Sequence, residues 1–511
     1  MATAAMAGDG ALLPPSRRML AGAVLALGNF MVVLDLTIAN VSIPHISGNL
    51  GITNEQGTWI ITSYAVAEAI CVPLTGWLSQ RFGAVRLFVM SLVGFGLFSL
   101  LCGLSMTLEM LVLCRIGQGI CGAPIMPMSQ TLMVRVFTVE GRAKAMAAWA
   151  MTVTLGPALG PVLGGVISDQ ISWHWIFLIN VPIAVLLAVG VIALLSEVET
   201  ARRKVPIDRI GLALTVLWIG SLQLMLDTGH NRDWFNDPFI MALAIIAGLG
   251  FIVFVIWELT EDHPIVDLRV FRHRGFTLSV AIMMLGFGAF FAGTVVVPQW
   301  LQTSLGYTAT TAGMVAAVHA YVAVLVSFPA AKLMPRVDLR LMIGFGLFWM
   351  IVSMGMRAFW TSDGDFWSYG LVMVIQGFGI PFMMVSLTTL ALSTVDPDEV
   401  ASAAGLNSFA RTVSLAVASS LSMTVWGDSE RVAGTEIAAH LQPEQVEATL
   451  GGMGFGTEQI REFLAAMAEK EAVGLAINHL FSVTTGVMML AMVLVFLMPK
   501  PERITGPGAA H

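Results

Sequence analysis

The sequence predicts an all-α protein that crosses a membrane fourteen times. Of its 511 residues, 57% are hydrophobic and only 12% are charged, whereas about 25% of the residues in a soluble domain are charged. The apolar residues fall into blocks about 20 residues long, the length of helix that crosses the ~30 Å hydrocarbon core of a bilayer. The charged residues gather between these blocks.

Fourteen apolar blocks are predicted to be spanning helices. The first is too long for the apolar region of a signal peptide and contains Asp35, so we interpret it as a spanning helix and not as a cleaved leader. A polar stretch, 427–476, separates the last two blocks and has helical patterning at 443–450 and 458–471. The blocks cover residues 19–43, 56–80, 85–105, 108–135, 143–167, 173–195, 208–228, 237–259, 275–300, 309–333, 340–360, 365–393, 399–426 and 477–497.

The positive charges predict the orientation. An even number of spans places both chain ends on one side, and nineteen of the 26 lysines and arginines fall on that side. The short segments on the other side hold only Arg232 and Arg357, while Arg115 and Arg411 lie within spans. Because basic residues are enriched on the cytoplasmic side, we expect a multi-pass inner-membrane protein with cytoplasmic termini.

A repeated pattern indicates duplication. In each copy a Gln-Gly pair is followed at the same spacing by a Thr-Leu pair. Both pairs lie in a proline-containing helix that leads to a short acidic loop. The first copy has Gln118-Gly119 and Thr131-Leu132, and the second has Gln376-Gly377 and Thr389-Leu390. Paired halves around a central site are typical of secondary transporters. We therefore predict six-helix bundles at 19–195 and 275–497, the second including 427–476, two inserted helices at 208–259, and cytoplasmic tails at 1–18 and 498–511.

Two carboxylates lie near the middle of predicted spans, away from the span ends. A charged side chain at the bilayer centre costs about 2.5–3.5 kcal/mol on insertion scales, so it is kept where it faces a polar cavity, is paired or is protonated. Asp35 lies in the middle of the first span and Glu68 near the middle of the second. We interpret both as proton-coupling residues, which at a shared depth would titrate as a coupled pair. A purely structural ion pair is the alternative for each.

Other polar side chains within spans extend the candidate site. Arg115 remains charged and needs an acidic or carbonyl partner, so we interpret it as a third proton-coupling residue; a static bridge between helices is the alternative. His319 is either a proton relay or a hydrogen-bonded packing residue. The predicted substrate contacts are Asp35, Asn40, Gln130, Asn180, Gln376, Asn407 and Arg411.

The fifth span is rich in glycine and proline, including Gly156, Gly160, Pro161, Gly164 and Gly165. Small residues at this spacing permit close helix contact in a membrane, and prolines bend a helix. We predict a mechanical role for this span in the rocking of the two halves or in preventing proton leak.

No motif of a soluble enzyme is found. The sequence lacks a Walker-type phosphate loop, HExxH, GxSxG and any metal-spaced Cys/His set. All four cysteines lie in apolar blocks without a CxxC pair and are interpreted as small buried apolar residues. We therefore expect neither an enzyme nor a bound cofactor or metal, and we expect the proton motive force to drive the protein.

Together these motifs resemble the fourteen-helix drug:proton antiporter family of the major facilitator superfamily, and in particular its multidrug exporter B subgroup. The resemblance covers nearly the whole chain. It is carried by Asp35 with Asn40 and Pro44, by Gly76, Arg81 and Gly83 in the loop after the second span, by Arg115, Gln118, Gly119 and Gly122, by the glycines and Pro161 of the fifth span, and by the 172–182 segment. The family usually has an acid at the position of Gln80, so the charge-relay role of that loop is not expected here.

The resemblance implies a major facilitator fold and proton-coupled export of small amphipathic compounds. It marks Asp35 for coupling of proton and substrate, and Gly76, Arg81 and Gly83 for gating. It also implies a periplasmic adaptor (membrane fusion) protein and an outer-membrane channel as partners, with 427–476 as the adaptor contact. The rival interpretations are an importer or symporter of the same fold, a lipid-modifying membrane enzyme and a passive scramblase.

Overall fold

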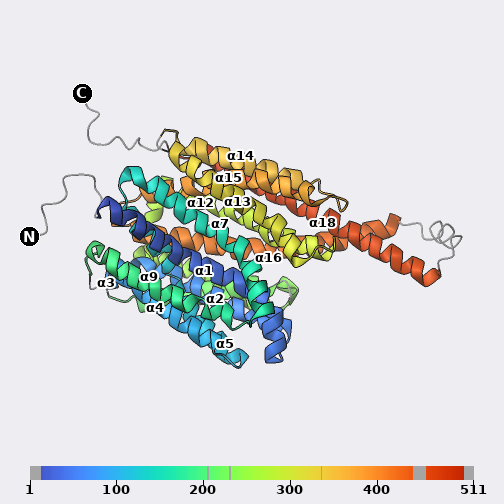
Figure 1. Ribbon diagram of the computed structural model, residues 1–511, viewed down its shortest axis with the longest axis horizontal. Helices are drawn as coiled ribbons and strands as arrows, with labels where there is room; N and C mark the ends of the chain where they lie inside the picture. Colours follow the sequence, from blue (N-terminus) through green and yellow to red (C-terminus); the bar gives the residue numbers. More distant parts are fainter. Residues whose placement is uncertain are drawn as a thin grey trace, which may run out of the picture.

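The computed structural model describes residues 13–203, 206–229, 232–334, 336–396, 398–440 and 456–499, and every regular element in these ranges is a helix. The long helices lie side by side in one elongated bundle (Figure 1). The helix α1 begins at the same end of the bundle as the end at which α18 finishes (Figure 1).

The first six predicted spans are all helical, and three of them are broken. Pro73 lies in the short helix between α2 and α3, and Pro124 lies between α5 and α6, because proline removes a backbone donor and disrupts a continuous helix. The elements are α1 (Pro15–Leu50), α2 (Asn54–Cys71), η1 (Val72–Leu74), α3 (Thr75–Phe82), α4 (Ala84–Gly103), α5 (Leu108–Gly122), α6 (Ile125–Val136), α7 (Val139–Gln170), α8 (Trp175–Leu178), α9 (Asn180–Leu195) and η2 (Ser196–Val198).

The remaining eight predicted spans are also helical. The inserted pair is α10 (Arg209–Gly229) and α11 (Pro238–Thr260), with η4 (Trp234–Asn236) between them and η5 (Leu268–Arg272) after them. The second bundle comprises α12 (Arg274–Thr303), α13 (Ala309–Leu333), α14 (Leu339–Arg357), α15 (Phe366–Ser393), α16 (Val400–His440) and α18 (Thr457–Phe496).

The polar stretch 427–476 differs from the loop that the sequence suggested. The helix α16 continues to His440 and α18 begins at Thr457, so both spans extend beyond the bundle as a helical hairpin (Figure 1). The predicted helical pattern at 458–471 is confirmed, and the one at 443–450 lies outside the described residues.

Composition alone supports twelve of the predicted spans. Among the described residues, twelve helical stretches are long and apolar enough to cross a membrane. The two predicted spans outside this set are α7 and α16, which carry many glycine, serine and threonine residues. Both helices pack between the two halves, where contact with protein replaces contact with lipid.

The two halves share one packing pattern, as duplication requires. The helix α1 packs on α7 and α9 just as α12 packs on α16 and α18, and α5 contacts α2 and α4 just as α15 contacts α13 and α14. Across the interface α7 contacts α13 and α15, and α16 contacts η1, α3 and α6. The inserted α10 packs on both α2 and α16, so it covers one seam between the halves.

Candidate functional site

Asp35 is the centre of a buried polar network in the N-terminal half. Its side chain is fully buried, and Oδ2 accepts a hydrogen bond of 2.6 Å from Arg115 Nη1 in a buried ion pair. The other oxygen, Oδ1, accepts from Gln118 Nε2 at 3.1 Å and from Asn180 Nδ2 at 2.7 Å. Three donors from α5 and α9 thus hold a carboxylate of α1 at a depth where an unpaired charge is unfavourable.

Arg115 is fixed on several sides. Its Nε donates to the carbonyl of Ile60 at 3.0 Å, and its guanidinium lies 4.4 Å from the ring centroid of Tyr64 and 5.5 Å from that of Phe177. Because the planar guanidinium uses separate donors for α1 and α2, lysine could not replace it. Arg115 was predicted to need an acidic or carbonyl partner; it has both, the carboxylate of Asp35 and the carbonyl of Ile60.

Glycines of α7 allow that helix to lie directly against α1 on either side of Asp35. A Cβ atom at Gly156 would lie 3.0 Å from Val33 Cβ, and one at Gly160 would lie 2.6 Å from Thr37 Cβ. Thr37 Oγ1 donates to the carbonyl of Gly156 at 3.1 Å. Any side chain at these two positions would separate the helices, so the spacing is required by packing.

The motif continues with Gly164 and ends there. A Cβ atom at Gly164 would lie 2.9 Å from the carbonyl oxygen of Ile38, whereas one at Gly165 would meet no atom within 4 Å. Gly165 is therefore not part of this contact, although the sequence suggested it. The side chain of Pro161 lies outside what the structure describes.

Further buried polar residues lie on α6 and α16, two helices that pack against each other across the interface between the halves. Gln130 of α6 and Asn407 of α16 are buried, and within the described chain both amide atoms of each lack a hydrogen-bond partner. Arg411 is also buried, with neither terminal nitrogen paired among these residues, and its guanidinium lies 5.2 Å from the ring of Trp149. Trp149 in turn donates to Ser129 at 2.8 Å. Unpaired buried polar atoms from both halves are typical of a site that takes a ligand or water.

Glu68 is buried in α2, within electrostatic reach of Arg411, Arg115 and Asp35. The coupling of Glu68 to Asp35 stays a prediction. Tyr64 lies within the electrostatic reach of both acids.

Gln376 lies in the C-terminal half beside an arginine that the sequence placed in a loop. That placement of Arg357 is wrong, because its side chain is 1% exposed in the last turn of α14. Arg357 Nη2 donates to Gln376 Oε1 and to the sulfur of Met373. His319 is also buried, with its ring 5.6 Å from that of Phe290 in an edge-to-face contact.

Of the other predicted substrate contacts, Asn180 donates to Asp35, which is itself one of that set, and Asn40 is exposed on α1. Both stay predictions. Two contributors were missed. Ser99 receives hydrogen bonds from Gln118 and Asn180 at 3.2 Å each, and Asp227, a carboxylate in the predicted span 208–228, accepts from Gln223 at 3.2 Å. A search for acids in every span would have found Asp227, whereas nothing in the sequence distinguishes Ser99 from other serines.

The helix α3 and the turn after it contact both their own half and the other. A Cβ atom at Gly76 would lie 3.2 Å from Ser402 Cβ of α16, so this glycine allows the halves to meet. Gly83 has φ of +90°, a conformation that favours glycine. The carboxylate of Glu199 lies against it and accepts from the backbone N–H groups of Val85 and Arg86 at 3.0 Å.

Gln80, at the position where the family usually has an acid, makes a structural contact through its backbone. The carbonyl of Gln80 accepts a hydrogen bond of 2.9 Å from the backbone N–H of Arg203. Arg203 also pairs with Asp398 of the C-terminal half at 3.7 Å, in an exposed contact. Arg81 lies on the surface with its guanidinium 5.8 Å from the Trp77 ring.

One cluster has metal-ligand composition. His273, Asp396 and Glu399 bring three candidate ligand atoms within 4.8 Å of one another. The guanidinium of Arg272 already donates to both carboxylates at 2.9 Å, so a protein cation occupies the position that a metal ion would take.

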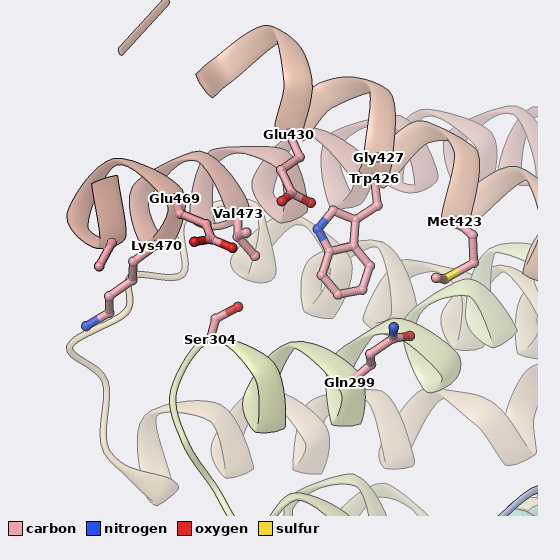
Figure 2. A pocket seen from close by; sticks show the side chains of 10 residues that line it. Gln299, Ser304, Met423, Trp426, Gly427, Glu430, Glu469, Lys470 and Val473 are labelled. Carbon is pink, nitrogen blue, oxygen red and sulfur yellow. The ribbon is translucent and has the colours of Figure 1, made fainter. Parts of the chain in front are cut away.

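A cavity of about 540 Å³ is lined by residues of α12, α16 and α18. Trp426 and the carboxylates of Glu430 and Glu469 face it, together with Met423 and Gln299 (Figure 2). Its mixture of aromatic, thioether and acidic groups suits an amphipathic molecule, but it lies apart from the Asp35 network.

Comparison with known proteins decides the family. A family model described as Major Facilitator Superfamily matches residues 25–419. The chain belongs to the Major Facilitator Superfamily. It is 38% identical to the "Multidrug export protein EmrB" of Escherichia coli strain K12, over 95% of this chain and 96% of that protein. It is 36% identical to the "Fatty acid resistance protein FarB" of Neisseria gonorrhoeae, with the same coverage.

A solved transporter structure has the same fold. The human organic anion transporter MFSD10 aligns with a TM-score of 0.58 at 14% identity, over 94% of this chain and all of that one. The expected family, the helical fold and the resemblance to exporter B proteins are thus confirmed. The chain is a multi-pass membrane transporter and not an enzyme.

Proposed function

We propose that this transporter exports small amphipathic compounds in exchange for protons. The observation that carries the proposal is the buried carboxylate of Asp35, which is paired with Arg115 and also held by two amide donors. A group of this kind can gain and lose a proton inside the membrane, and its charge state decides whether the ion pair exists.

Proton binding would act on α7 through α1. Protonation of Asp35 removes the negative charge that holds Arg115, so the network that joins α1, α5 and α9 weakens. Because α7 packs on α1 through Gly156 and Gly160 and also contacts α13 and α15, a shift of α1 is transmitted to the interface of the halves. Alternating access would follow from rocking of the two halves about that interface.

The substrate site that we propose is the interface group of Gln130, Asn407 and Arg411, with Glu68 beside it. The group combines buried donors and acceptors of both halves with the aromatic ring of Trp149. Such a mixture suits amphipathic molecules of varied shape. The names of the relatives, a multidrug export protein and a fatty acid resistance protein, support small amphipathic substrates.

We place the transporter in the inner membrane with cytoplasmic termini. The positive-inside distribution of basic residues supports this orientation. The α16–α18 hairpin would then project into the periplasm, where it offers a surface for an adaptor protein that leads to an outer-membrane channel. This partnership rests on the resemblance to exporter B proteins.

The sign of transport under an imposed pH gradient tests the proposal. In inverted membrane vesicles, acidification of the lumen should drive uptake of a fluorescent amphipathic dye, and collapse of the gradient should stop it. Dye movement in the direction of the protons would instead support a symporter. Movement that ignores the gradient would support a passive scramblase.

A further inference from the structure

Among the described residues, Arg357 is a buried cation without an acidic partner. Its guanidinium donates to the Gln376 carbonyl oxygen, and its other hydrogen bonds run to the sulfurs of Met373 at 3.1 Å and Met354 at 3.7 Å, which are weak acceptors. Within the described residues, Arg357 Nε and Gln376 Nε2 have no acceptor. A buried charge without a counter-charge or a full set of hydrogen bonds is strongly unfavourable.

The N-terminal half shows what an arginine at this place requires. There Gln118 binds both Arg115 and the carboxylate of Asp35. The duplication makes Gln376 the counterpart of Gln118, since Gly119 lies against the backbone of Tyr64 just as Gly377 lies against that of His319. The cation is kept in the second half, although α14 supplies it instead of the helix that carries the glutamine.

No counterpart of Asp35 lies beside this cation among the described residues of the second half. In α12, the counterpart of α1, the residue beside the cation is Gly293, and a Cβ atom there would lie 2.6 Å from Arg357 Nη1. Helices α12 to α15 contain no aspartate or glutamate. In the described chain, the first acid of α16 is Asp428 and the last of α18 is Glu471, both beyond the bundle interior.

We propose that Arg357 and Gln376 form an anion site in the C-terminal half, in the place that Asp35 fills in the N-terminal half. The ligand is a monovalent anion that supplies the missing charge. It is either a free halide ion or the carboxylate of an acidic amphipathic substrate, and the second source rests on the proposed export function. Trp360 and Phe481, with ring centroids 5.6 and 5.4 Å from the guanidinium, exclude water and so strengthen the attraction.

The test uses a matched pair of substitutions at one glycine. Gly293→Asp supplies a fixed carboxylate beside Arg357, and Gly293→Asn has the same size without the charge. Thermal unfolding of the purified full chain is measured in potassium chloride and in potassium gluconate, whose anion is bulky, at equal ionic strength. We expect chloride to raise the melting temperature of the wild type and Gly293→Asn, and to leave Gly293→Asp and Arg357→Met unchanged.

A second arm separates the two sources of the anion. Binding of 2-naphthoate and of its neutral methyl ester is followed by fluorescence. We expect naphthoate to bind at least tenfold more weakly to Gly293→Asp and Arg357→Met than to Gly293→Asn, with equal binding of the ester. An effect of naphthoate without one of chloride assigns the site to substrate, and the reverse assigns it to a free halide.

The site does not exist if neither anion distinguishes Gly293→Asp from Gly293→Asn. Proton-driven dye uptake by the wild type would in that case still support the export function. Conversely, anion binding that depends on Arg357 in a protein without gradient-driven transport would leave the site intact and overturn the export function.

Discussion

At the scale of single residues, the charge of the buried Asp35 can be neutralised in two ways, by an ion pair or by a proton. Asp35 is balanced by Arg115 when it is charged and needs no partner charge when it is protonated. A static ion pair would have the same geometry as a coupling pair, so the distinction between them is functional. Removing the charges of Asp35 and Arg115 together distinguishes a structural ion pair from a proton-coupling pair.

Removal of one partner should destabilise the fold more than removal of both. Arg115→Gln leaves the Asp35 carboxylate buried and unpaired, an effect of about 3–5 kcal/mol for pairs of this kind. Asp35→Asn with Arg115→Gln removes both charges, so we expect the melting temperature to recover most of the loss. Proton-driven transport should nevertheless remain absent in the double variant. If the double variant recovered both its melting temperature and proton-driven transport, the ion pair would be only structural.

At the scale of elements, the contact between α1 and α7 links the acid to the moving interface. The contact depends on glycines because the backbones approach so closely that a single methyl group does not fit. The sequence suggested a mechanical role for both the glycines and the prolines of the fifth span. The close contacts of α7 with α1 are made at Gly156, Gly160 and Gly164.

Two alanine substitutions in α7 should therefore behave in opposite ways. Gly160→Ala places a methyl group against Thr37 and should destabilise the protein by about 1–3 kcal/mol, as overpacking does, with loss of transport. Gly165→Ala meets no neighbour within 4 Å and should be neutral or slightly stabilising, since alanine favours helix over glycine. Thermal melting and dye uptake of both variants give the comparison. If the two variants had the same stability and the same dye uptake, the contact between α1 and α7 at Gly160 would have no special role.

At the scale of the whole molecule, two duplicated halves meet along α7 and α16, with the inserted α10 covering one seam. On the side of the loop between α3 and α4, the halves touch where Gly76 meets Ser402. This contact must open if the halves rock during transport.

A disulfide across this contact should stop transport reversibly. A Cβ atom at residue 76 lies 3.2 Å from Ser402 Cβ, close to the separation of about 3.5–4.5 Å in disulfides. Gly76→Cys with Ser402→Cys, in a chain whose four native cysteines are replaced, should lose dye uptake on oxidation and regain it on reduction. Each single cysteine variant is the control. Full uptake by the oxidised double variant would show that this face does not open.

The sequence predicted the helices, the family and the need of Arg115 for an acidic or carbonyl partner, because long apolar blocks and the charges within them can be recognised in the sequence. That this partner is Asp35 came from the structure. Prediction from the sequence failed where the outcome depends on which helix face meets which. Arg357 lies near the end of the predicted block 340–360 and so looked like a loop charge, yet the last turn of α14 buries it. In the polar stretch 427–476 only 443–450 and 458–471 showed helical patterning, so the continuation of α16 to His440 was not predicted.

The most direct measurement of proton exchange at Asp35 is proton release caused by substrate. Wild-type protein in proteoliposomes or detergent, in weakly buffered solution, should release protons when an amphipathic substrate is added, as a pH indicator reports. Asp35→Asn should release none, while Glu68→Gln should change the amount of release without abolishing it. Undiminished proton release by Asp35→Asn, with substrate still bound, would contradict the account.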